Sequence, residues 1–184
     1  MKYSVETLLK EIAEGKEHQY LFFWKNDPSE DGTIIQSCLS QWWDEGFEVE
    51  NIRYATAEHW MMAEKARLFQ DEEMVKAILE DKSPASAQKF GRQVKGFNKA
   101  TWVQHRFEIV KQGSLHKFAK NEALKAFLLG TKNQVLVEAS PLDKIWGIGL
   151  DEANENAGNP TKWNGLNLLG FALMEARDEL LLEN

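Results

Sequence analysis

A succession of helical patterns fills the middle of the chain and limits the folds open to it. From Thr56 onward, the spacing of apolar residues predicts five helices in a row, at 56–70, 72–81, 84–92, 99–112 and 114–130. Ser83-Pro84 suits the start of the third helix, and Asn98 or Thr101 could cap the fourth. Two more helices are expected, over Val5 to Lys16 and from about Leu166 to Leu182. Helix must therefore dominate the fold.

Strand patterns are short and few by comparison. They are expected at Tyr20 to Trp24, at Glu48 to Tyr54 and at Gln134 to Glu138. The predicted class is therefore α+β, mainly α, with the 184 residues forming one domain. Residues 1–19 are interpreted as an N-terminal helical extension of that domain.

Charge and cysteine content exclude several classes of protein. The chain has 22 Lys and Arg against 29 Asp and Glu, a net charge of −7, which argues against a protein that coats phosphate backbones. A single cysteine, Cys38, allows no intramolecular disulfide and no cysteine-based zinc site. The four histidines lack metal-ligand spacing, so neither a metal nor a cofactor is expected. The sequence shows no signal peptide and no long apolar run, which predicts a cytoplasmic protein without membrane contact.

Tryptophan is unusually abundant, with 7 residues. Trp146 and Trp163 lie in a long loop, Ala139 to Asn167, that is rich in Gly and Asn. Indoles in such loops often wall a ring-binding cleft, although core packing is equally open for each of them. A loop of this length is expected to pack over something functional.

The predicted helix 56–70 places two charged residues among apolar ones. On a helical wheel, Glu58 and Lys65 lie in the middle of the stripe that carries Met61, Met62 and Phe69, about 10 Å apart along the axis. The other side of this helix carries Trp60, Ala63, Glu64 and Arg67. Two explanations stay open for the buried charges. In the first, the helix dipole stabilises Glu58 in the first turn, and the Lys65 side chain extends outward to solvent. In the second, both side chains project into a cleft.

The second explanation has a definite chemistry. An amine in apolar surroundings has a lowered pKa and can attack a carbonyl or a masked aldehyde. A carboxyl group in the same surroundings has a raised pKa and can donate or accept a proton. Glu58 and Lys65 could thus flank one sugar ring.

A set of short motifs occurs in a fixed order from Phe22 to the C-terminus. They are Tyr20-Leu-Phe-Phe-Trp24, Leu39-Ser-Gln-Trp42, the segment Thr56 to Phe69, Gly91-Arg92, Trp102, Lys117-Phe118, Leu128-Leu129, Leu136-Val-Glu-Ala-Ser140, Asp143 to Leu150, and Trp163 to Gly170 with Leu173-Met174 and Arg177. In this order the motifs resemble those of the YbiA-like, or NADAR, domain family. Two departures, Leu39-Ser40-Gln41 for a usual Phe-Ser-Asn and Trp60 for a usual Tyr, put substrate detail in doubt.

The resemblance implies hydrolysis of an N-glycosidic bond. Members of this family cleave the base–ribose bond of riboflavin-pathway intermediates, the ribosylamino-pyrimidine phosphates, and this small molecule is the expected substrate. Others remove ADP-ribose from guanine bases, so ADP-ribosylated nucleic acid is the alternative partner. The basic residues from Lys82 to Lys99 could form a strip for a strand. A non-catalytic ADP-ribose or NAD-binding module is the third hypothesis, against which Glu58 and Lys65 argue.

Two mechanisms are compatible with this expectation. In the first, Lys65 forms a Schiff base with C1 of the opened ribose while Glu58 transfers protons to the leaving amine and from water. In the second, water attacks an oxocarbenium ion directly, with Glu58 stabilising the cation and Lys65 only holding phosphate or hydroxyl groups.

Further substrate-binding candidates each have a plainer alternative. Arg92 suits a phosphate or a surface salt bridge, and Trp102 suits base stacking or the core. Asp143 could bind ribose hydroxyls or cap a turn. Trp146 and Gly147 could bring an indole and backbone amides to a phosphate, or form an ordinary turn.

Two more candidates flank predicted helices. His59, at the margin of the apolar stripe, could orient Glu58. Asn167 suits the N-cap of the last helix, with a role in the site as the other interpretation.

Overall fold

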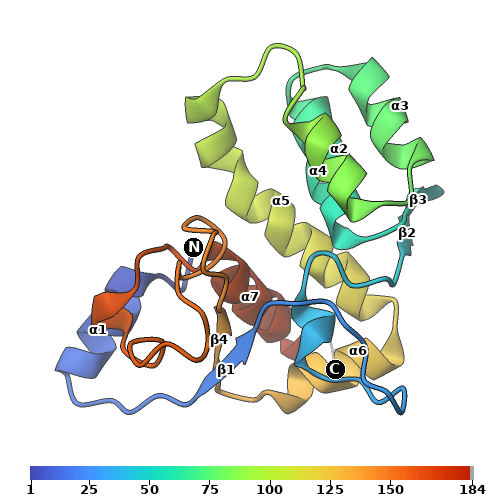
Figure 1. Cartoon of the computed structure of the whole chain (residues 1–184). Coiled ribbons are helices and arrows are strands. Elements are labelled where there is room, and N and C mark those ends of the chain that lie inside the picture. Colours follow the sequence, from blue (N-terminus) through green and yellow to red (C-terminus); the bar gives the residue numbers. More distant parts are fainter. Residues whose placement is uncertain (183–184) are drawn as a thin grey trace.

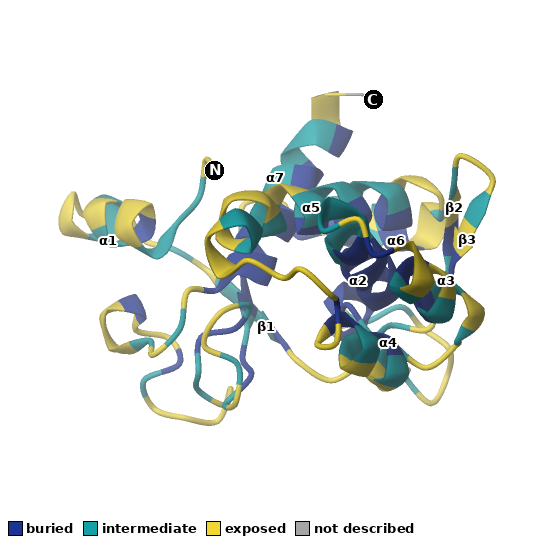
Figure 2. Cartoon of the chain, turned by 90° about the horizontal axis from the view of Figure 1, so that it is seen from above, coloured by how far each residue is buried: buried dark blue, intermediate teal, exposed yellow. Residues whose placement is uncertain are grey.

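Helix α2 (Ala57–Leu68) is buried over most of its residues in the computed structural model of the protein, which describes residues 1–182. It packs against α3 (Glu72–Glu80), α4 (Pro84–Gly91) and α5 (Lys99–Ala119) (Figure 1). Figure 2 shows α2 in the colour of buried residues. Trp60 and Ala63, which the sequence places on the other side of this helix from Glu58 and Lys65, are buried as well, being only 8% and 0% exposed. A helix enclosed by three neighbours has no single buried face.

Helix α5 continues through the position where the sequence predicts a break. The expected helices 99–112 and 114–130 are in fact α5, which ends at Ala119, and α6 (Glu122–Gly130), which Asn121 caps. Gly113 lies inside α5 because Trp60 crosses the helix there. A Cβ atom at Gly113 would lie 2.4 Å from Trp60 Cδ1, and the Trp60 indole donates a hydrogen bond to Ile109 O at 2.8 Å. The glycine permits close packing and does not end the helix.

The strands form two small sheets. β1 (Tyr20–Phe23) pairs in parallel with β4 (Val135–Glu138), so that Phe23 lies opposite Glu138. The expected strand 48–54 is a hairpin of β2 (Phe47–Val49) and β3 (Ile52–Tyr54). Its turn residues, Glu50 and Asn51, have positive φ angles of 51° and 64°, which suits a tight turn between antiparallel strands.

The last helix, α7 (Leu168–Leu182), packs against α5, α6 and β4 and is buried along most of its length. Between β4 and α7 runs the long loop, which contains the short 3-10 helix η2 (Pro160–Lys162) and the fully buried Ile148. A second 3-10 helix, η1 (Gln36–Leu39), follows β1. The loop is therefore packed, as the sequence predicts.

Helix α1 (Val5–Ala13) lies at the edge of the molecule and combines exposed and half-buried residues with the buried Leu8 (Figures 1 and 2). It is shorter than the predicted 5–16. The residues before it contact α7, where Tyr3 Oη and Lys2 Nζ donate to Asp178 Oδ2 at 2.8 and 2.5 Å. Residues 1–182 thus contain seven α-helices, two 3-10 helices and two two-stranded sheets, which confirms the α+β, mainly α class. Over the same residues, no helix has both the length and the apolar character needed to cross a membrane.

Candidate active site

A cavity of about 350 Å³ opens between α2, α4, the start of α5 and the loop that follows β4. It contains both charged residues of the α2 stripe. It also contains four of the predicted substrate-binding residues. The lining residues are Ser40, Gln41, Trp42, Glu58, Met61, Met62, Lys65, Gln88, Arg92, Trp102, Glu138, Asp143, Ile145, Trp146 and Leu169.

Lys65 projects from α2 toward the end of α4. Its Nζ donates a hydrogen bond to Gly91 O at 2.7 Å and lies 4.5 and 5.4 Å from the ring centroids of Phe97 and Trp102. Burial lowers the pKa of this amine, and the positive charge of Arg92 lowers it further, whereas Glu58 acts in the opposite direction. A larger fraction of neutral amine makes Lys65 a better nucleophile.

Glu58 lies in the first turn of α2 and is only 3% exposed. Burial raises the pKa of its carboxyl group to about 8, an effect that hydrogen bonding from Trp42 opposes and the charge of Asp143 reinforces. Its Oε1 is buried and has no hydrogen-bond partner. A helix N-terminus stabilises a carboxylate, but here the cost of burial outweighs it. The group can therefore hold a proton near neutral pH and transfer it.

The segment after η1 forms one wall through Ser40, Gln41 and Trp42, which the sequence interpretation did not select as site residues. The buried Lys117 of α5 fixes this segment, since its Nζ donates to Cys38 O and Ser40 O at 2.6 and 2.8 Å. Burial lowers the pKa of Lys117 to about 7. These residues stand among the ordered motifs, which was the one signal in the sequence that could have found them.

The long loop forms the opposite wall with Asp143 and Trp146. Asp143 Oδ1 accepts hydrogen bonds from the backbone N–H groups of Ile145 and Trp146 at 2.7 and 2.8 Å. Both interpretations of Asp143 are therefore compatible with its position, because it caps a turn and also lines the cavity. Its charge raises the pKa of both Glu58 and Glu138, so it influences the two buried carboxyl groups.

Glu138, at the end of β4, is a site residue that the sequence interpretation missed. It is half-buried overall, while its Oε2 is enclosed and has no hydrogen-bond partner. Burial raises the pKa of its carboxyl group to about 8, and the charges of Asp143 and Glu58 add to the effect. An acidic residue that ends an otherwise apolar strand was the available signal.

Three predicted residues lie outside or at the rim of the cavity. His59 is 1% exposed and is not a lining residue, and its Nδ1 lies 2.9 Å from Thr56 Oγ1. Gly147 is a buried residue of the loop, and a Cβ atom there would lie 2.8 Å from Glu138 O. Arg92 is exposed at the rim, where its Nη2 donates to Gln88 Oε1 at 2.8 Å.

Asn167 does not cap α7 with its side chain. It also is not one of the lining residues. Its amide instead binds the backbone of β4, donating to Leu136 O and accepting from Glu138 N–H, each at 2.9 Å. Asn167 therefore contacts the site through the backbone of a lining residue.

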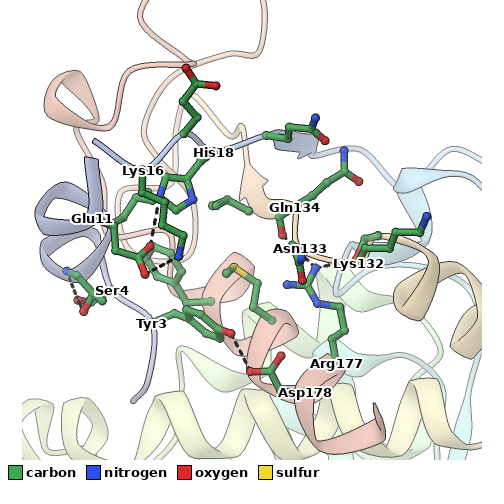
Figure 3. A pocket seen from close by; sticks show the side chains of 18 of the residues that line it. Tyr3, Ser4, Glu11, Lys16, His18, Lys132, Asn133, Gln134, Arg177 and Asp178 are labelled. Carbon is green, nitrogen blue, oxygen red and sulfur yellow. Dashed lines mark hydrogen bonds and ion pairs between the residues drawn. The ribbon is translucent and has the colours of Figure 1, made fainter. Parts of the chain in front are cut away.

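A larger cavity, of about 990 Å³, lies between α1, α7 and residues 130–135 (Figure 3). Several of its charged side chains bind other side chains or the backbone. Lys16 Nζ lies 2.7 Å from Glu11 Oε1, and Arg177 Nη1 donates to Thr131 Oγ1 and Gln134 O at 2.8 and 3.0 Å. None of the predicted site residues lines it. Chemistry rather than size therefore selects the smaller cavity as the candidate active site.

Comparison with known proteins shows the family to which the chain belongs. The family model of the NADAR domain matches residues 22–181. The chain belongs to the NADAR domain family. N-glycosidase R617 of Acanthamoeba polyphaga mimivirus is 40% identical over 166 residues, covering 88% of this chain and 96% of the relative. N-glycosidase Npun_R5314 of Nostoc punctiforme is 29% identical over 143 residues, covering 78% and 85%.

The NMR structure of Escherichia coli YbiA superposes with a TM-score of 0.70 at 24% sequence identity, covering 91% of this chain and 88% of YbiA. The two proteins therefore share a fold. The family and the N-glycosidase relatives place this NADAR protein among the N-glycosyl hydrolases. Over residues 1–182, no group of three or more His, Cys, Asp or Glu side chains is arranged to hold a metal ion.

Proposed function

We propose that this N-glycosyl hydrolase cleaves the base–ribose bond of ribosylamino-pyrimidine 5′-phosphates, which are intermediates of riboflavin biosynthesis. The observation that carries the proposal is the pairing, in one cavity, of a half-buried amine with a lowered pKa and a buried acid with a raised pKa. Such substrates carry a masked aldehyde at ribose C1, which suits attack by an amine.

The remaining walls suit the rest of this substrate. Trp42, Trp102 and Trp146 offer flat surfaces for a pyrimidine ring. Arg92 at the rim offers a guanidinium group for the 5′-phosphate. A cavity of about 350 Å³ is at the small end of ligand sites, which favours a mononucleotide over a larger substrate.

In the proposed reaction, the ribosylamine opens to an imine at C1, and the neutral Lys65 amine adds to that carbon. Glu58 then protonates the nitrogen of the base, the C1–N bond to the base breaks, and the Lys65 lone pair forms the Schiff base. Water adds to C1, and the C1–Nζ bond breaks to release the ribose aldehyde and free Lys65. The alternative, direct attack of water on an oxocarbenium ion, uses the same acid but forms no bond to Lys65.

The second candidate substrate is ADP-ribosyl-guanine in nucleic acid. Its support is the exposure of Lys82, Lys89, Lys95 and Lys99 around the segment that carries Arg92 at the cavity rim. A nucleic-acid strand could lie across these residues while the ADP-ribose enters the cavity. Binding would then weaken as the salt concentration rises.

A paired turnover assay tests the proposal. Wild type and Lys65→Ala are each incubated with the ribosylamino-pyrimidine phosphate and with an oligonucleotide that carries ADP-ribosyl-guanine. We expect wild type to release base from the first substrate and Lys65→Ala to be inactive, with Lys76→Ala, an exposed lysine of α3, as a matched control of unchanged activity. Release of ADP-ribose from the oligonucleotide alone would instead establish the second function. ADP-ribose binding without turnover of either substrate would indicate a binding module.

Borohydride reduction during turnover separates the two mechanisms. A Schiff base on Lys65 should be trapped as a stable ribose phosphate adduct, which mass spectrometry of peptides locates. Turnover at an undiminished rate with no adduct on Lys65 would favour direct attack by water.

A further inference from the structure

Two elements far apart in the sequence bring carboxyl groups to the same cavity. Glu58 comes from the start of α2, and Glu138 comes from the end of β4. Each has one buried carboxyl oxygen without a hydrogen-bond partner, Oε1 in Glu58 and Oε2 in Glu138. A buried, unpaired carboxylate oxygen is costly, so its retention in a cavity wall calls for an explanation.

The backbone around Glu138 is fixed from three directions. Its N–H donates to Asn167 Oδ1 at 2.9 Å, and its carbonyl oxygen accepts from Ile148 N–H at 2.9 Å. The next residue, Ala139, donates to Phe23 O at 2.8 Å across the parallel pair. These contacts fix the backbone at the strand end, so that only the side chain of Glu138 is free to move. A positioned carboxyl group with an unused oxygen is suited to proton transfer.

The charges around the two carboxyl groups make both of them harder to ionise. Asp143 lies close enough to raise the pKa of both carboxyl groups, and Glu58 raises that of Glu138. Two acids that repel one another in an enclosed site do not both ionise near neutral pH. Because both pKa values are raised to about 8, each carboxyl group can hold or release a proton near neutral pH, and the pair can supply an acid and a base for successive steps.

We propose that Glu138 is a second catalytic carboxyl group, which acts as the base for the water that hydrolyses the Lys65 Schiff base. This inference rests on the proposed function. Glu58 donates its proton to the leaving base, and the base departs with the electrons of the C1–N bond. Glu138 then takes a proton from water as the water oxygen bonds to C1.

The second half of the cycle restores both groups. Glu138 returns its proton to the Lys65 nitrogen, Glu58 takes the hydroxyl proton, and the C1–Nζ bond breaks to give the aldehyde. Lys65 and Glu138 are again neutral amine and carboxylate, and Glu58 again carries its proton. The net reaction consumes one water and needs no other reactant.

Rapid-quench kinetics of Glu138→Gln test the assignment. We expect one equivalent of base to be released in a burst at the wild-type rate, because Lys65 and Glu58 are intact. Steady turnover should then be about 100-fold slower, since a general base contributes at least this factor. More borohydride adduct should accumulate on Lys65 than in wild type. The control is Glu155→Gln, at an exposed position in the loop that follows β4, which should behave as wild type.

The outcomes separate the inference from the proposed function. A wild-type protein that releases no base would overturn the function itself. If wild type is active, either unchanged turnover in Glu138→Gln or loss of the burst together with turnover would overturn the role of Glu138. A second measurement uses Glu138→Ala in place of the Gln variant. If this variant lacks a general base, added formate should restore its turnover. Absence of rescue would count against the assignment.

Discussion

Asn167 binds the free edge of β4 beside Glu138 as a further strand would. Its amide oxygen accepts from the Glu138 N–H and its amide nitrogen donates to Leu136 O, both at 2.9 Å. To do so, Asn167 adopts a φ angle of +51°, a left-handed conformation that asparagine tolerates better than most residues. The residue that precedes α7 thus also holds the strand that carries a site carboxyl group.

Replacement of Asn167 separates these two contributions. Asn167→Gly keeps the backbone conformation accessible but removes both hydrogen bonds, so we expect a loss of about 2–4 kcal/mol in the free energy of unfolding. Asn167→Ala should lose about 1 kcal/mol more, because alanine is disfavoured at this φ angle. Urea denaturation measures both values. Equal stability of the two variants would contradict the importance of the left-handed conformation.

Gly113 provides a test of helix packing. Alanine normally stabilises a helix relative to glycine, but a Cβ atom here would meet Trp60 Cδ1 at 2.4 Å. We therefore expect Gly113→Ala to lower the free energy of unfolding by about 1–3 kcal/mol. The control is Gly130→Ala at the end of α6, where a Cβ atom would meet nothing within 4 Å, and thermal unfolding should show it unchanged or slightly stabilised.

The buried carboxyl groups predict that stability depends on pH. Folding raises the pKa of Glu58 and Glu138 from 4.5 to about 8, so between these values the folded state binds protons that the unfolded state has released. Their contribution is complete below the unfolded pKa and is lost as pH rises through the folded pKa. The free energy of unfolding should therefore fall from mildly acidic to mildly alkaline pH.

The double variant Glu58→Gln, Glu138→Gln isolates this effect. His59 and His116, whose pKa values are lowered by burial, act in the opposite sense and are present in both proteins. Urea denaturation across this pH interval should give a flatter dependence for the double variant. The same slope in both proteins would show that the carboxyl groups are not responsible.

Lys117 connects the core to the wall of the cavity, so we expect its replacement to affect both stability and substrate binding. Lys117→Met keeps much of the side-chain volume but leaves Cys38 O and Ser40 O without their donor. We expect about 2–4 kcal/mol of lost stability, since buried unpaired carbonyl groups are costly. The wall formed by Gln41 and Trp42 should also loosen, which a raised KM would report. A variant with lost stability and unchanged KM would confine Lys117 to a structural role.

Much of the helical fold could be predicted from local patterns. The caps at Ser83 and Asn98 are present, and the helices lie within a few residues of their expected ranges. The predictions of a helix break at Gly113 and of a single strand at 48–54 were wrong. The first structure depends on a residue far away in the sequence, and the second depends on backbone angles that the apolar pattern does not specify. Gly113 is explained by Trp60, which is 53 positions earlier in the sequence, and the hairpin by two positive φ angles.

The candidate site divides in the same way. Glu58 and Lys65 were found because charges within an apolar helical stripe are visible in the sequence, and Arg92, Trp102, Asp143 and Trp146 line the same cavity. Glu138 was missed although it is an acidic residue at the end of an otherwise apolar strand, because its place in the cavity depends on how β4 packs with distant parts of the chain. The two interactions of Asn167 depend on that same strand.

The parallel pairing of β1 with β4 has a consequence for the newly made protein. Helices α2 to α5 are adjacent in the chain and can form contacts while synthesis continues, since domains fold as their residues emerge from the ribosome. The cavity, however, needs Glu138, Trp146 and Leu169, which are made late. Gly91, Phe97 and Trp102 can therefore surround Lys65 early in synthesis, whereas the cavity itself is complete only after Leu169 has been translated.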